Sequence, residues 1–272
     1  MKALISVDME GISGIVHSSE TNPERYDYQR GRELMTAEAN AVIAGVLDAE
    51  PTADVLVADA HGTFRNLLPE QLDRRARLVR GKPRALNMLA GLDEETDAAL
   101  FVGYHVRAGE GPGVLAHTMN GEILDVRVTG RSLGEIGLNA AMAGHLGVPV
   151  VLLSGDDAAC AEAAALIPEA VTVPALGMAA AVTLHPEEAR DRLRRAAADA
   201  VSRRTEIPSL ALTGPLDVEI DLASPHTIDL ATLVPGVSRT AGARTVAFTA
   251  PDYGTAYRLI LLLAQLATIR SA

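Results

Sequence analysis

Acidic and histidine side chains recur in this sequence directly after short apolar runs that are rich in strand-favouring residues. The side chains at these positions are Asp8 with Glu10, Asp59 with His61, His105, and Asp156 with Asp157. Because ligands of open parallel sheets bind outside the carboxyl ends of the strands, we expect these groups to meet at one edge of a sheet. Carboxylates and imidazoles gathered in one place are typical of a metal site.

Asp8 and Glu10 are two residues apart, and such residues project to the same side of an extended backbone. Both carboxylates can therefore face one cation, while Met9 points into the core. Gly11 and Gly14 then allow the backbone to turn sharply away. Capping of a following helix, or solvation in a loop, would also account for two acids at this position.

Two histidines occupy comparable positions. His61 has the same two-residue relation to Asp59, and His105 stands at the end of the next apolar run. Imidazole and carboxylate together suit zinc best, and manganese, cobalt and iron are the other metals that this ligand chemistry accepts.

His117 follows the glycine-rich segment 108–114, which is typical of a substrate-facing loop, although a plain surface loop would also carry such a histidine. Glu135 falls in the first turn of a predicted helix, where the helix dipole favours a carboxylate in any case. Asn139 lies one turn further along the same helix face, so it could orient Glu135 or a ligand.

Asp156 and Asp157 open a predicted helix over 158–167. Capping of this helix accounts for at least one of them. Support of a metal ligand, or contact with a substrate, is the alternative role for these two acids.

The elements that must position these residues follow from the apolar pattern. Strand-like runs alternate with helical patterns, which predicts an α/β fold with a mostly parallel central sheet and flanking helices. The predicted strands are 3–7, 55–58, 99–103 and 148–153, and the predicted helices are 33–50, 84–92 and 133–146. A long polar loop covers 11–32, and an alternating run at 123–128 meets Thr129 and Gly130 in a predicted hairpin.

The pattern changes near residue 185. A charged amphipathic stretch, two strand-like runs and a closing helix follow, at 187–204, 216–222, 245–250 and 253–269. We therefore predict an α/β metal-binding catalytic domain over 1–185 and a smaller C-terminal α+β domain over 186–272 that makes oligomer contacts.

Composition excludes several classes of protein. A chain of 272 residues with 48% hydrophobic residues can bury a core of one or two domains. A net charge of −11 and the lack of Trp argue against nucleic acid and anionic membrane as partners. One cysteine, no signal-peptide pattern and no apolar run near the roughly 20 residues of a membrane span predict a soluble cytoplasmic protein.

The sequence resembles the DppA-type D-aminopeptidases, a family of zinc metallopeptidases associated with dipeptide-transport operons. The motifs that carry the resemblance are SVDMEGISG at 6–14, RGR and MTAEAN within 30–40, DAHG at 59–62, GYH at 103–105, HTM at 117–119 and GEIGLNA at 134–140. The match is dense up to about residue 157, and it continues mostly as a pattern beyond that point.

The resemblance implies two zinc ions per chain. Its metal-binding positions match Asp8, Glu10, His61, His105 and Glu135. Asp8 would bridge both ions, and the position that matches His117 is assigned to catalysis. The resemblance also implies a decamer of two stacked pentameric rings, whose inner channel admits small peptides.

The expected activity is hydrolysis of short peptides with an N-terminal D-residue, such as D-Ala-D-Ala. Two metal ions about 3.5–4 Å apart would activate a shared water that attacks the scissile carbonyl. His117 would act as general acid or base, or as oxyanion donor, and the residues leave this choice open.

Two alternatives remain at this stage. Segments 17–23 and 110–113 depart from the family pattern, so a metal-dependent amidase or an L-peptide aminopeptidase is the first alternative. The second is a non-enzymatic, metal-stabilised ring protein, although a structural metal site does not need five ligands beside a spare histidine.

Overall fold

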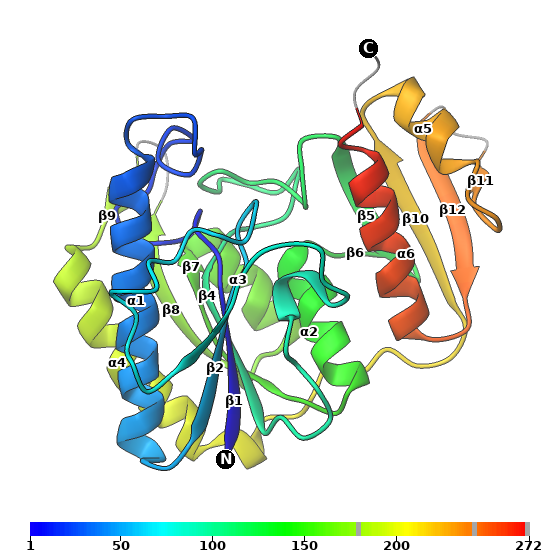
Figure 1. The fold of residues 1–272 in the computed structure, drawn as a ribbon. Coiled ribbons are helices and arrows are strands. Elements are labelled where there is room, and N and C mark those ends of the chain that lie inside the picture. Colours follow the sequence, from blue (N-terminus) through cyan, green and yellow to red (C-terminus); the bar gives the residue numbers. More distant parts are fainter. Residues whose placement is uncertain (178–180, 241–243, 270–272) are drawn as a thin grey trace.

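A computed structural model describes residues 1–177, 181–240 and 244–269 of the chain (Figure 1). Two sheets organise these residues. The first has the strand order β3-β2-β1-β4-β7-β8-β9, and the second has the order β11-β12-β10-β5-β6.

The first sheet is parallel except for its last strand. Its members are β1 (Lys2–Val7), β2 (Asp54–Asp59), β3 (Arg77–Val79), β4 (Ala98–Tyr104), β7 (Val150–Asp156), β8 (Val171–Gly177) and β9 (Val182–Thr183). Only β9 runs antiparallel to its neighbour. The four predicted strands form the centre of this sheet, which confirms the predicted α/β class with a mostly parallel sheet and flanking helices.

Helices cover both faces of this sheet. On one face lie α1 (Tyr28–Ala49) and α4 (Pro186–Ser202), and on the other lie α2 (Glu135–His145) and α3 (Asp157–Leu166) (Figure 1). Consecutive side chains of β1 therefore enter different cores. Ile5 packs with the α1 side and Leu4 with the α2 side, and both are buried.

Two local expectations were wrong. Helix α1 begins at Tyr28, so the long loop after β1 is shorter than the predicted 11–32. The segment 84–92 forms only a 3-10 turn, η1 (Asn87–Leu89), instead of a helix. Asn87 adopts a left-handed backbone with φ 49°, which interrupts any regular α-helix through this segment.

The second sheet is antiparallel and carries its own helices. It contains β5 (Ile123–Val128), β6 (Arg131–Ser132), β10 (Leu216–Leu222), β11 (Ser238–Arg239) and β12 (Thr245–Ala250), with α5 (Pro225–Ala231) and α6 (Tyr253–Leu266) beside it. The predicted hairpin joins β5 to β6. Thr129 and Gly130 both have positive φ, at 50° and 79°, as a two-residue hairpin turn requires.

The predicted boundary at residue 185 does not separate the two sheets, because each sheet contacts an element from the other side of it. Helix α4 packs against α1 on the first sheet, although it follows the predicted boundary. The hairpin β5–β6 pairs with β10 in the second sheet, although it precedes that boundary. The division between the sheets thus does not coincide with residue 185, and domains at 1–185 and 186–272 stay a prediction about folding units.

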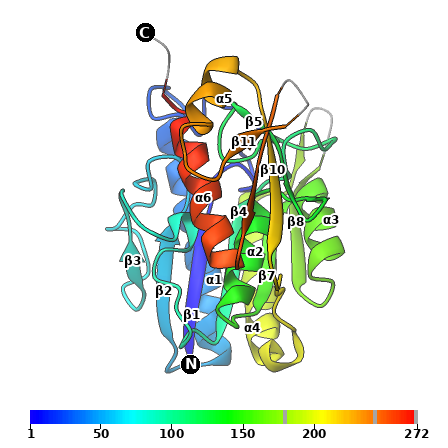
Figure 2. The ribbon, with the colours of Figure 1, turned by 90° about the vertical axis from the view of Figure 1, so that its right-hand side faces the viewer.

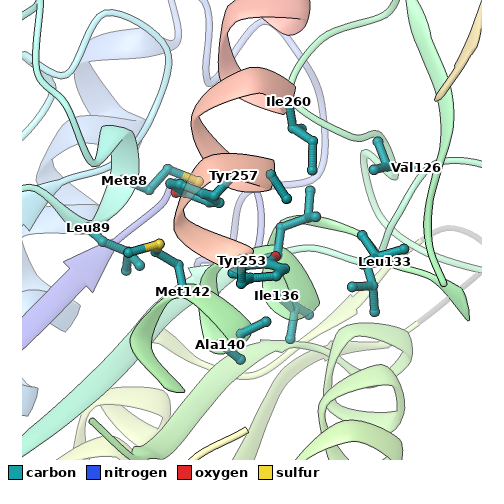
Figure 3. Close-up of a cluster of buried hydrophobic side chains, with 14 of the residues drawn as sticks. Met88, Leu89, Val126, Leu133, Ile136, Ala140, Met142, Tyr253, Tyr257 and Ile260 are labelled. Atoms are coloured by element: carbon teal, nitrogen blue, oxygen red, sulfur yellow. Dashed lines mark hydrogen bonds between the residues drawn. The ribbon is translucent and has the colours of Figure 1, made fainter. Parts of the chain in front are cut away.

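Helix α6 joins the two parts of the molecule. It contacts α2 on one side and β10 and β12 on the other (Figures 1 and 2). Figure 3 shows Tyr253, Tyr257 and Ile260 of α6 in the buried cluster with residues of α2. The Tyr253 hydroxyl donates to Leu138 O at 2.9 Å, and the Tyr257 hydroxyl donates to Asn139 Oδ1 at 2.6 Å. These bonds fix α2, and with it the residues at its N-terminus.

Every helix within residues 1–177, 181–240 and 244–269 falls short of a membrane span in length or in apolar character. The expected cytoplasmic location stays a prediction.

Candidate metal centre

The carboxyl ends of three neighbouring strands deliver the central side chains of the site. Asp8 follows β1, His61 follows β2 and His105 follows β4. Strand β1 pairs with both β2 and β4, so the three ends lie next to one another. The structure thus brings together residues that are far apart in the sequence.

Gly11 allows the chain to leave this edge. A Cβ atom at Gly11 would lie 2.0 Å from Tyr104 O, so only glycine fits where the loop crosses the end of β4. The Gly11 N–H donates to Gly103 O at 2.8 Å and holds the loop there. Asp8 and Glu10 are positioned by this close approach.

The carboxylates and imidazoles lie within a few ångströms of one another. His61 Nδ1 lies 3.0 Å from Glu10 Oε2 and 3.4 Å from Asp8 Oδ1. His105 Nε2 lies 3.5 Å from Asp8 Oδ2 and 3.3 Å from Glu135 Oε1. The two oxygens of Asp8 therefore face two different histidines, an arrangement that suits a carboxylate shared by two cations.

His117 lies at the open side of this group. Its ring stacks on that of His105, with centroids 3.9 Å apart and planes 12° apart. Its Nε2 lies 3.8 Å from Glu135 Oε1, and its side chain is 31% exposed against 1% for His105. Glu135 is held in place by the Met119 N–H, which donates to Oε1 at 2.6 Å.

Each of the three imidazoles is anchored by a backbone carbonyl. His61 Nε2 lies 3.0 Å from Thr21 O, His105 Nδ1 3.0 Å from Val106 O, and His117 Nδ1 2.8 Å from Leu115 O. Because a carbonyl only accepts, the anchored nitrogen must carry the proton, and in the neutral ring the other nitrogen has a free lone pair. All three free nitrogens face the carboxylates, as in metal-binding histidines.

Two buried atoms test whether these residues fit a metal. Asp8 Oδ2 and His105 Nε2 have no hydrogen-bond partner among the described residues. An unpaired buried polar atom is costly, and a divalent cation would compensate both. Two sets of possible ligand atoms, each within 4.8 Å, overlap at His105: Asp8, Glu10 and His105, and His105, His117 and Glu135. This nitrogen and oxygen donor set fits zinc.

In the metal-free protein the same groups compete for protons. Burial, together with the charge of Glu10, raises the pKa of Asp8 to about 7. Burial acts to lower the pKa of His105, but Glu135 and Asp8 outweigh it and raise that pKa to about 10. Asp8 and His105 thus hold protons at the positions where cations would bind, so metal binding must displace these protons.

Asp59, the other acid at the end of β2, turns away from this group. Its Oδ2 accepts hydrogen bonds from the Asn66 and Leu67 N–H groups, at 2.5 and 2.7 Å, and its Oδ1 accepts from the Asn66 side-chain amide at 2.7 Å. It therefore shapes the loop after β2, and the two-residue spacing with His61 does not bring it to the centre.

Three further candidates lie outside the cluster. Asn139 bonds to Tyr257 and Tyr104, and none of its described hydrogen bonds reaches Glu135. Asp156 caps α3 by accepting from the Ala159 N–H at 2.6 Å, and its other oxygen accepts from the Val114 N–H at 2.5 Å. It thus holds the loop that leads to His117.

Asp157 is exposed, and its carboxylate accepts from the Ala158 N–H at 3.1 Å. The structure gives it only this local contact, away from the metal-ligand candidates.

A cavity of about 480 Å³ adjoins the cluster, and no pattern in the sequence predicts it. Asp8, His61, His117 and Glu135 reach it from one side. The other lining residues include Phe64, Lys82, Arg84, Arg258, Leu261 and Leu262. They come from loops and from α6, so no strand-end pattern marks them.

Comparisons with known proteins identify relatives of this chain. A family model described as D-aminopeptidase, Peptidase_M55, matches residues 1–262. The chain is 37% identical over 270 residues to the D-aminopeptidase of Bacillus subtilis (strain 168), with 98% of each chain covered. It superposes with a TM-score of 0.96 and 36% identity, over all of both chains, on a solved structure described as the Zn-dependent D-aminopeptidase DppA from Bacillus subtilis, a self-compartmentalizing protease.

Proposed function

This chain belongs to the D-aminopeptidase family of peptidases, and from that premise we propose that it is a zinc-dependent enzyme that removes N-terminal D-residues from short peptides such as D-Ala-D-Ala. The observation that carries the proposal is the meeting of Asp8, His61 and His105 at three adjacent strand ends, with unpaired buried acceptors between them. The Zn-dependence described for the superposed structure supports the choice of metal.

The proposed centre holds two zinc ions per chain. Asp8, Glu10, His61, His105 and Glu135 would bind them, and Asp8 would be shared because its oxygens face different histidines. When bound, a zinc pair polarises a carbonyl and lowers the pKa of water. The carbonyl anchors on His61 and His105 keep their free nitrogens directed at the centre without reorganisation.

His117 is the proposed catalytic residue. Its ring lines the cavity beside Glu135, and the bond of Nδ1 to Leu115 O leaves Nε2 free to give or accept a proton. A substrate in the cavity would meet this nitrogen at the centre's open side. His117 would serve as general acid or base for the departing amine, or as a donor to the developing oxyanion.

The proposal includes an oligomer. The superposed relative is described as self-compartmentalizing, which supports an assembly that encloses its active sites. We propose a homodecamer of two pentameric rings for this chain, with small peptides as the substrates that can enter. Residues 186–272 would contribute contacts between subunits.

Release of free amino acid from D-Ala-D-Ala, with L-Ala-L-Ala in parallel, tests the proposed activity. Both are measured before chelation, after chelation and after zinc restoration. We expect zinc-restored release from the D-peptide alone. Equal release from both peptides would indicate a peptidase without D-specificity, and release from simple amides alone would indicate an amidase.

A further inference from the structure

The cavity beside the metal-ligand candidates is lined by both acidic and basic side chains. The acids that line it are Asp8 and Glu135, both metal-ligand candidates. Its basic lining residues, called here the cationic wall, are Lys82 and Arg84, which follow β3, and Arg258 of α6. This cationic wall stands out in a chain with a net charge of −11.

Arg84 is held rigidly at this wall. Its guanidinium carbon lies 3.7 Å from the centroid of the Phe64 ring, at stacking distance. Its Nη2 donates to Asp59 O and its Nη1 to Val79 O at 3.4 Å. Each of these nitrogens carries a second N–H, so the planar group retains donors for a ligand.

Phe64 supports a second cation. Lys82 Nζ lies 4.7 Å from the centroid of the same ring. Phe64 is buried and has a left-handed backbone with φ 59°, which is rare for a bulky residue. Such strain persists where the surroundings fix it, and it is common at ligand sites.

The charge of Arg84 has no carboxylate partner among the described residues. The charge of Asp59 acts on Arg84 and raises its pKa, but no ion pair joins them, since the Asp59 oxygens accept hydrogen bonds from Asn66 and Leu67. Burial lowers the pKa of Arg84 to about 10, so its charge is partly desolvated. A half-buried guanidinium of this kind is suited to bind a carboxylate, because its fork matches two carboxylate oxygens.

We propose that Arg84, assisted by Lys82, binds the free C-terminal carboxylate of a short peptide whose N-terminal residue lies at the metal-ligand cluster. This inference rests on the proposed function, and it adds the recognition of the substrate's C-terminal carboxylate. The carbonyl that Arg84 contacts belongs to Asp59, two residues before His61. Arg84 and His61 line the same cavity, so one bound peptide can contact both the cation and the metal-ligand cluster.

The test compares D-Ala-D-Ala with its C-terminal amide, which lacks the carboxylate charge, in the wild type and in Arg84→Met. We expect the variant to raise KM for the acid about tenfold or more, with kcat changed less and with little effect on the amide. Arg80→Met is the matched control, because Arg80 is exposed, bonds to Arg65 O and does not line the cavity. Equal losses on both substrates, or no loss on the acid, would overturn the proposal.

Zinc content and melting temperature show whether Arg84→Met folds. If it does not, Lys82→Met and Arg84→Lys replace it, since the first removes the assisting charge and the second keeps charge without the planar fork. Both should lose activity selectively on the acid, and a loss shared with the amide would contradict the assignment.

A binding measurement separates this inference from the proposed function. Calorimetry on the metal-free protein compares the acid with the amide without turnover. If the wild type hydrolyses neither peptide, the proposed function fails, yet tighter binding of the acid that disappears in Arg84→Met would still support the carboxylate site. Equal binding of acid and amide, or no binding, would overturn it.

Discussion

Asp8 is the residue on which the proposed centre depends most, because its two oxygens face His61 and His105 separately. Asp8→Ala should therefore lose more than one ligand contact: we expect zinc content to fall well below two ions per chain and D-Ala-D-Ala hydrolysis to fall at least about 100-fold. Metal analysis and amino acid release measure both effects.

Asp157→Ala is the matched control for that change, because Asp157 is an exposed strand-end acid whose one side-chain hydrogen bond among the described residues is to its own helix. It should retain zinc and activity. A fully active Asp8→Ala protein would contradict the two-metal centre.

Substitution of His117 should reduce turnover without affecting metal binding. His117→Ala removes a half-exposed ring that faces the cavity, while His105 and Glu135 remain in place. We expect hydrolysis to fall by about 10²–10⁴-fold, the usual loss of a general acid or base, with zinc content unchanged. Loss of zinc from this variant would make His117 a ligand, as its place in one of the two ligand groups allows.

At the residue scale, the sequence predicted where the metal-ligand cluster lies, but not which of the nearby acids belong to it. Strand-end position brought out Asp8 and His105 because parallel strands must end at one edge. The same rule also selected Asp59, and only the loop that follows it decides that its oxygens bond to Asn66 and Leu67. The proposed role of Arg84 could not be predicted from the sequence, since it depends on a contact with the Phe64 ring in another loop.

At the scale of elements, Glu38 connects α1 to the loop that carries the first two acids. Its Oε1 accepts from the Ser13 N–H at 2.8 Å, and its buried Oε2 has no partner among the described residues. Burial raises the pKa of Glu38 from 4.5 to about 7, although the Ser13 bond and Arg190 oppose this. Between pH 4.5 and about 7, Glu38 therefore keeps its proton in the folded protein, whereas in the unfolded chain it has lost this proton.

Stability should consequently fall as the pH rises from about 4.5 to about 7, and Glu38→Gln should lose this dependence. At pH 8 we expect the free energy of unfolding of the variant to be higher than that of the wild type by on the order of 1–3 kcal/mol. At pH 6 the difference should be smaller. Urea unfolding of both zinc-loaded proteins at the two pH values measures it. A difference that is independent of pH would contradict the assignment to this carboxyl.

The elements with strong periodicity were predictable, and those fixed by tertiary contact were not. The central strands and α1 show clear apolar patterns, and Pro51 marks the end of α1. The segment 84–92 has a helical pattern, yet the left-handed Asn87 and the packing of Met88 and Leu89 in the core produce only a short turn. The edge strands β3 and β9 are too short to leave a signal.

At the scale of the whole molecule, the sheets could not be divided from the sequence. Helix α4 is charged and amphipathic, which suggested a new unit, but its buried face packs on α1. The hairpin β5–β6 joins β10, which lies about 90 residues later, and no local pattern encodes that partnership.

The proposed assembly has a direct consequence for size. Ten chains of 28.5 kDa make a particle of about 285 kDa. Light scattering after size exclusion should give this mass at micromolar concentration. A monomer mass under the conditions where the enzyme is active would contradict the proposed enclosure of the active sites.

Zinc titration of the metal-free protein, with D-alanine release measured at each step, tests the central claim most directly. The proposed centre predicts that release from D-Ala-D-Ala rises until two zinc ions per chain are bound and then stays constant, while L-Ala-L-Ala is not cleaved. Full activity without zinc, or a plateau at one ion per chain, would contradict a two-zinc D-aminopeptidase built on Asp8, His61 and His105.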